Sequence, residues 1–136
     1  MAVGLATSDG DDLRPISDAR PAECLDVSLE RGNQVGGYTR RPCKSGHGFE
    51  VVGVVTSTAA KGDAYPGSDA LDSLGQKQCL PLFAGYVGIG FGDSQLLIRL
   101  LTPNPDSWAS GDRETICLVQ SGDGHQLVGS VRNSRR

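Results

Sequence analysis

The sequence predicts an α+β fold, in which one main helix packs on a small, mostly antiparallel β-sheet and two disulfides staple the domain. A β-branched run at residues 49–58 (FEVVGVVTST) is typical of a strand that is covered on both faces. Apolar side chains recur at helical spacing over residues 71–86. Four widely separated cysteines stand in a chain of 136 residues with 19 glycines and 5% aromatic residues, a composition typical of disulfide-stapled domains.

The predicted helix begins after a tight turn. Residues 65–67 (Tyr-Pro-Gly) break the preceding pattern, and Ser68 is a natural N-cap. Cys79 belongs to the apolar stripe of the helix, so we expect its side chain to face the core. Pro81 has no backbone N–H, and we expect it to kink or split the helix near residue 80.

Four further strands are predicted around these two elements. Residues 24–29 alternate apolar and polar side chains, as in a half-buried strand, and residues 31–37 (RGNQVGG) have the composition of a turn. Three strands are expected after the helix, at residues 94–103, 113–121 and 125–132. This order contains no alternation of parallel strands and helices, which argues against a nucleotide-binding α/β fold.

We expect one folded domain at residues 22–132, between a flexible tail or linker at residues 1–21 and a disordered C-terminus at residues 133–136. No stretch approaches the ~20 consecutive apolar residues of a membrane span, and the start lacks the basic region of a signal peptide. Disulfides persist in oxidising compartments. We therefore expect an extracytoplasmic location, with the protein secreted or held by a membrane anchor outside these residues.

Charge and motif content argue against several classes of function. The net charge is −3 with both signs interspersed, so the chain carries no footprint for nucleic acid. The segment GYVGIGFG at residues 85–92 lacks the G-x-G-x-x-G and GK[ST] patterns of nucleotide loops, and we expect no cofactor. No carboxylate pair and no Ser-His-Asp arrangement has a spacing that suggests catalysis, so we do not expect an enzyme.

The segment Cys43-x3-His47 is the place where the chain could carry chemistry. As nucleophile and base, the pair would need a thiolate at Cys43. As a metal site, it would need two more ligands from Glu50, Asp63 or His125. In a third interpretation Cys43 is oxidised, and the ring of His47 ties its loop to backbone carbonyls or to Glu50. We favour this third interpretation, without a metal, because four cysteines with no C-x2-C pair suit two disulfides.

A second candidate site is the turn-rich loop that contains the only tryptophan. Trp108, Asp112 and Arg113 could grip a sugar or a peptide, with the indole as a platform. In the structural alternative, which we favour, Trp108 covers an edge of the core and Asp112 holds Arg113 or caps the turn. Tyr65 could bind a ligand, but we expect it to pack beneath the start of the helix.

The ordered landmarks of the chain resemble the septum-formation domain family of high-GC Gram-positive bacteria. Members of this family have a Cys-x3-His-x2-Glu-Val segment, a Tyr-Pro-Gly turn, a helix cysteine, a Pro…Trp-x2-Gly-Asp-Arg…Cys segment and a Gly-Ser strand. The residues at matching places, within about residues 22–131, are Cys43, His47, Glu50, Val51, Tyr65, Pro66, Gly67, Cys79, Pro105, Trp108, Gly111, Asp112, Arg113, Cys117, Gly129 and Ser130. The resemblance implies an extracytoplasmic domain, usually behind a single membrane anchor, that is associated with cell division and has no known catalytic activity.

We therefore expect a non-catalytic extracytoplasmic interaction domain in cell division, with an envelope or divisome protein or a cell-wall polymer as its partner. The alternative is a small thiol- or metal-dependent enzyme that uses Cys43 and His47. Among the three possible disulfide connectivities we favour Cys43–Cys79 with Cys24–Cys117, which would pin the loop before the valine strand to the helix and the first strand to a late one. The candidate binding surface comprises Trp108, Asp112, Arg113, Tyr65, His47, Arg40 and Arg41.

Overall fold

The computed structural model describes residues 13–29 and 35–136. Five strands form a single sheet in the order β2-β1-β3-β5-β4, and every pairing is antiparallel. The elements are η1 (Ile16–Asp18), β1 (Cys24–Leu29), β2 (Val35–Arg41), β3 (Phe49–Thr56), α2 (Ser68–Val87), η2 (Phe91–Asp93), β4 (Leu96–Leu101), α3 (Pro105–Ala109) and β5 (Glu114–Ser121). The predicted α+β class, with one main helix on an antiparallel sheet, is confirmed.

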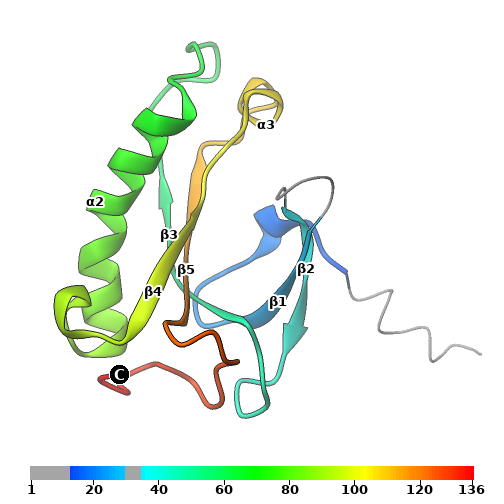
Figure 1. The fold of residues 1–136 in the computed structure, drawn as a ribbon. Coiled ribbons are helices and arrows are strands. Elements are labelled where there is room, and N and C mark those ends of the chain that lie inside the picture. The colour runs from blue at the N-terminus through cyan, green and yellow to red at the C-terminus, as the bar shows by residue number, and fades with distance from the viewer. Residues whose placement is uncertain (1–12, 30–34) are drawn as a thin grey trace, which may run out of the picture.

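The sheet is covered on both faces, because α2 lies on one side and the β1–β2 hairpin turns toward the other (Figure 1). β1 pairs with β3 only through Cys24–Glu50 and Leu25–Phe49, so the hairpin is free to leave the plane of the other strands. Strand β5 shows the two-sided burial directly, since its alternate residues enter two different cores. Val119 packs beneath α2, whereas Leu118 packs against the hairpin.

Helix α2 buries one residue in every four, as the helical period requires for a single contact face. The buried positions are Leu71, Gly75, Cys79, Phe83 and Val87. Cys79 faces the core as predicted. The expected split at Pro81 is wrong: α2 runs unbroken from Ser68 to Val87. Pro81 lies on the exposed side of the helix, where water can solvate the carbonyl group that the missing N–H leaves unpaired.

Three local predictions are corrected by the structure. Strand β2 covers part of the segment 31–37 that was expected to be a turn, and residues 31–34 lie outside the described residues. The strand expected at 125–132 is reduced to one bridge between His47 and Leu127. A short helix, α3, replaces the expected loop. It begins at a capping box in which the Asn104 side chain accepts from the Ser107 N–H.

Both expected chain ends include residues that pack on the domain. Residues 1–12 of the expected tail lie outside the described residues. The remainder of that tail is anchored, because Arg14 and Tyr38 exchange backbone hydrogen bonds and Ala19 is buried. At the other end, the Arg135 N–H donates to the carbonyl of Val87, so the expected disorder at 133–136 gives way to contacts with the end of α2. No helix within the described ranges is long and apolar enough to span a membrane.

Candidate functional site

All four cysteines form disulfides, in a pairing that differs from the one favoured by the sequence. Cys24 is joined to Cys43, and Cys79 is joined to Cys117. The β1–β2 register places Cys24 opposite Arg41, which brings Cys43 to a Cα–Cα distance of 5.2 Å. The prediction failed because it did not include β2. We call Cys24–Cys43 the hairpin disulfide and Cys79–Cys117, which joins α2 to β5, the helix disulfide.

The imidazole of His47 is completely buried and organises its loop, as predicted. Its Nδ1 lies 2.8 Å from the carbonyl oxygen of Ser45. A carbonyl can only accept, so Nδ1 is the donor and carries a proton. Its Nε2 has no hydrogen-bond partner among the described residues and lies 3.9 Å from Glu50 Oε1. With Cys43 oxidised, the pair lacks the thiolate nucleophile that a Cys–His enzyme would need.

Glu50 is a fully buried carboxylate that accepts three hydrogen bonds. Its Oε1 accepts from the Val131 N–H at 2.9 Å, and its Oε2 accepts from Ser130 Oγ at 2.7 Å and from the Tyr86 hydroxyl at 2.5 Å. Burial of the phenol, together with its hydrogen bond to Glu50, raises the pKa of Tyr86 to about 12. One side chain of β3 thereby holds α2 and the C-terminal segment together. The network is a structural anchor.

This corner does not fit a metal ion. The sulfurs of Cys24 and Cys43 and a carboxylate oxygen of Glu50 lie within 4.8 Å of one another. Both sulfurs belong to the hairpin disulfide, however, and a metal would require thiolates. Of the other predicted ligands, the Asp63 carboxylate accepts from the Ala60 N–H in the loop before α2, and His125 is exposed beside Asp123 in the turn after β5.

Trp108 lies inside the domain, with only 4% of its surface exposed. Its Nε1–H donates to the Asp63 carbonyl at 2.7 Å, and the Tyr65 ring meets it edge-on at 6.0 Å. The Tyr65 hydroxyl is also occupied, because it donates to the carbonyl of Pro103. The indole and the phenol therefore pin the loop before α2 to α3. This agrees with the structural interpretation favoured for Trp108.

Arg113 stacks on the same indole and joins two loops through main-chain acceptors. Its guanidinium carbon lies 3.7 Å from the centroid of the Trp108 ring, a cation–π contact. One terminal nitrogen donates to the carbonyls of Trp108 and Asp112, and the other donates to those of Ala60 and Lys61. The Asp112 carboxylate accepts from the backbone N–H of Glu114 and so caps the turn. Trp108 contributes to the wall of a cleft of about 250 Å³, whereas Asp112 and Arg113 line a separate one of about 520 Å³.

The predicted residues do not form one site. Strand β2 ends at one end of the sheet, near the loop that carries Cys43 and His47, whereas α3 lies at the opposite end (Figure 1). Arg40 and Arg41 are exposed beside the hairpin disulfide and are paired with carboxylates: Arg40 lies 3.4 Å from Glu23, and Arg41 lies 2.9 Å from Asp26.

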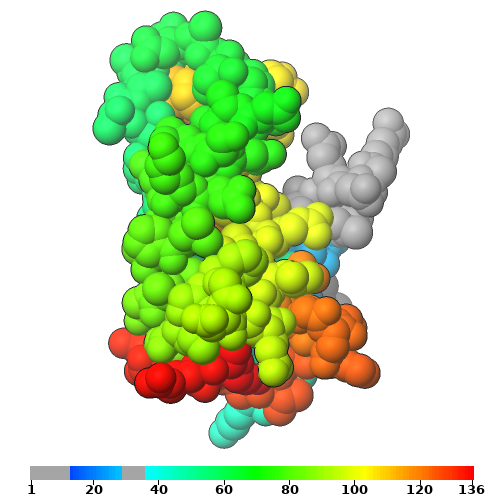
Figure 2. Space-filling view, turned by 60° about the vertical axis from the view of Figure 1, so that its left-hand side comes forward, coloured from blue at the N-terminus to red at the C-terminus, as the bar shows by residue number. Residues whose placement is uncertain are grey.

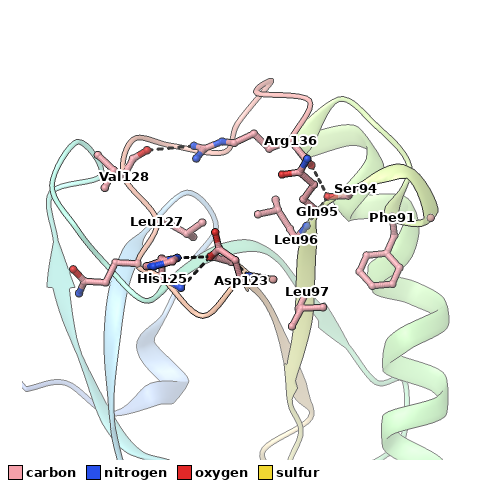
Figure 3. Close-up of a pocket in the computed structure, with 14 residues that line it drawn as sticks. Phe91, Ser94, Gln95, Leu96, Leu97, Asp123, His125, Leu127, Val128 and Arg136 are labelled. Carbon is pink, nitrogen blue, oxygen red and sulfur yellow. Dashed lines mark hydrogen bonds and ion pairs between the residues drawn. The ribbon is translucent and has the colours of Figure 1, made fainter.

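A surface groove that the sequence did not reveal lies between the start of β4, the turn after β5 and the C-terminal segment (Figure 3). Its volume is about 790 Å³. Polar side chains from all three segments line it: Ser94, Gln95, Asp123, His125 and Arg136. Leu97 and Val128 add apolar surface that is 46% and 63% exposed, respectively.

The polar side of this groove is fixed by local hydrogen bonds. The Ser121 hydroxyl and the His125 backbone N–H both donate to Asp123, and these bonds lower the pKa of that carboxyl to about 2. His125 Nδ1 lies 3.3 Å from the same carboxylate. Arg136 spans the other rim, where its guanidinium donates to the carbonyls of Gly129 and Ser130. The sequence signal for this groove is the Asp-Gly-His turn at residues 123–125, which connects the strands expected at 113–121 and 125–132.

Comparison with known proteins gives one finding. A family model described as Septum formation matches residues 21–135, which is nearly the whole chain. No curated protein and no solved structure gives a match.

Proposed function

Because the chain belongs to the Septum formation family, which points to a role in cell division, we propose that it is a non-catalytic, extracytoplasmic interaction domain that acts at the cell envelope. The observation that carries the proposal is the oxidation of all four cysteines in two bonds that the strand register and the helix packing set up. Structural disulfides of this kind persist outside the reducing cytosol.

The disulfides contribute a large part of the stability of a domain with so small a core. Chain-entropy arguments give about 3 kcal/mol for the hairpin disulfide, which closes a separation of 19 residues, and about 4 kcal/mol for the helix disulfide, which closes one of 38. Together they are comparable with the whole net stability of a small protein, about 5–15 kcal/mol. A protein that depends on these bonds suits an oxidising compartment.

The side chains that could carry out catalysis have structural roles in the fold, which supports a binding function for the domain. The Cys43 sulfur lies in a disulfide, and the His47 ring is sealed from solvent. All three donors around Glu50 use its carboxylate to hold the C-terminal segment. The thiol- or metal-dependent enzyme considered from the sequence would need Cys43 as a free thiolate.

The groove of Figure 3 is the surface that we propose for the partner, and a protein is the partner that it suits. Its exposed aliphatic side chains, Leu97 and Val128, lie beside amide, hydroxyl and charged groups, a mixture typical of protein interfaces. Recognition of sugar rings commonly uses an exposed aromatic platform, whereas Trp108 is buried and Phe91, the aromatic residue that lines the groove, packs edge-on against Phe83. We therefore favour an envelope or divisome protein over a cell-wall polymer.

The first test is a thiol count in denaturant. We expect no reactive thiol before reduction and four after it. Two or more free thiols in protein isolated from its native compartment would contradict the proposed location and would reopen the enzyme interpretation.

The second test is capture of partners with the immobilised domain, using solubilised envelope proteins in one arm and isolated cell-wall sacculi in the other. We expect Leu97→Asp to reduce capture from the protein arm. Leu13→Asp is the matched control, because Leu13 is 51% exposed and does not line the groove. Binding to sacculi alone would favour the polymer, and equal capture by both variants would exclude the groove.

A further inference from the structure

Strand β3 has one complete edge and one edge that is paired only at its start. On the β5 side, pairing runs from Glu50 to Thr56. On the opposite side, β1 pairs with Phe49 and Glu50, and the preceding segment exchanges backbone hydrogen bonds with Val51. Beyond Val51, no described segment pairs with this second edge.

The backbone groups on the free edge can be assigned from the alternation of an antiparallel strand. The Ser57 N–H donates to the carbonyl of Arg113, which shows that residue 57 faces the β5 side. Alternate residues of a strand direct both backbone groups to the same side. Val55 therefore also faces β5, and Val54 and Thr56 direct their N–H and C=O groups outward.

An exposed apolar stripe of α2 runs along the same edge. Leu74 and Leu82 are 45% and 38% exposed, and each lies four residues from Gln78. Leu82 stands over Gly53, where an added Cβ would come within 2.6 Å of its Cδ1. Leu74 and Ser57 line the same cleft at the other end of the edge. Figure 2 shows that α2, in green, lies at the surface of the molecule.

We propose that a second copy of this chain docks on this edge and forms a two-fold symmetric dimer through antiparallel β3 strands. With the two-fold axis at Val55, Val54 lies opposite Thr56 of the partner subunit, and Thr56 lies opposite the partner's Val54. Each pair exchanges two N–H···O bonds, so that the outward backbone groups of both chains are satisfied. The result is a continuous sheet with two α2 helices side by side.

Self-complementarity is what selects a second copy as the occupant. Gly53 and Ser57 are equally distant from Val55, and they lie beside Leu82 and Leu74, respectively. The two-fold axis at Val55 therefore also runs close to Gln78, which is midway between the two leucines. As a result, Leu74 of one chain faces the partner's Leu82. The same side chains meet in both directions, as an isologous interface requires. At the end of the sheet formed by β4, Arg99 lies in the centre of the strand, and its charge opposes self-pairing there.

Analytical ultracentrifugation of the 136-residue protein over a range of concentrations tests the proposal. The same measurement is made on two variants that place a charge of either sign at position 78. We expect a reversible dimer. Gln78→Glu and Gln78→Lys should each weaken it by about ten-fold or more, because like charges meet across the axis. An equimolar mixture of the two variants should restore dimerisation. Gln76→Glu, the same change on the opposite flank of α2, should leave the dimer unaltered.

Amide hydrogen exchange gives an independent readout of the seam. Exchange at Val54 and Thr56 should slow as the dimer forms, whereas Gln78→Glu should abolish that protection. A protein that remains monomeric near millimolar concentration would overturn the proposal. A dimer that neither Gln78 variant weakens would do the same. Either result leaves the proposed role of the groove in Figure 3 untouched, since the groove lies on β4 and the C-terminal segment.

Discussion

Replacing Glu50 by Leu removes an acceptor that three donors share, and the cost depends on which donors can reach water instead. Ser130 is exposed and Tyr86 is partly exposed, so both hydroxyls can turn to solvent. Val131 is completely buried, and its N–H would be left without a partner. A buried donor without an acceptor costs about 1–3 kcal/mol, while removal of a desolvated carboxylate recovers part of that cost. We expect the free energy of unfolding to fall by about 2 kcal/mol.

Denaturant titration with the disulfides intact measures this change, and hydrogen exchange locates it. The amide of Val131 should lose protection in Glu50→Leu more than amides in β5 do. Glu50→Gln is the matched control, because its carbonyl oxygen can still accept from Val131 while its amide donates to the hydroxyls. It should cost less than half as much. If Glu50→Leu were as stable as the natural protein and Val131 stayed protected, the carboxylate would not be the anchor of the C-terminal segment.

The remaining predictions concern three other parts of the domain. Trp108→Ala should lower the free energy of unfolding by about 3–5 kcal/mol, because a buried ring is lost; a variant that melts normally but no longer captures its partner would show that the ring binds instead. Stability should decline as the pH rises from about 10, where the unfolded phenol ionises, to about 12, the raised pKa of Tyr86 in the fold. Tyr86→Phe should remove that part of the alkaline loss, and an unchanged pH profile would refute the assignment. Replacing the helix disulfide by two alanines should lower the free energy of unfolding by about 0.6 kcal/mol more than the same change at the hairpin disulfide, because it opens a loop twice as long.

The elements that could be predicted from the sequence are those whose burial follows a local period. The valine run of β3 and the stripe of α2 carry their own signal, and both formed where it placed them. Strand β2 carries no such signal, because its partners are β1 and Arg14 rather than one apolar face. Gly37 is needed there, since a Cβ would lie 2.6 Å from the carbonyl oxygen of Arg14. That contact depends on tertiary structure.

The same limit applies to the candidate sites. The burial of Trp108 could be inferred because a lone tryptophan in an aromatic-poor chain usually fills a core. The acceptors of Arg113 at Ala60 and Lys61 could not, because they lie 53 and 52 residues away in the sequence. The sequence predicts a last strand at residues 125–132, but the buried carboxylate of Glu50 holds this segment in place of a neighbouring strand.

The cysteines pair in the order in which they occur in the sequence, first with second and third with fourth, and this has a consequence for how the protein matures. A chain that emerges from its N-terminus presents Cys24 and Cys43 before Cys79, so an oxidant that joins the first available thiols makes the native bond. The second loop, from Cys79 to Cys117, neither encloses nor crosses the first. Oxidation in order of appearance is therefore already correct, and no bond must be broken and exchanged to reach the native set.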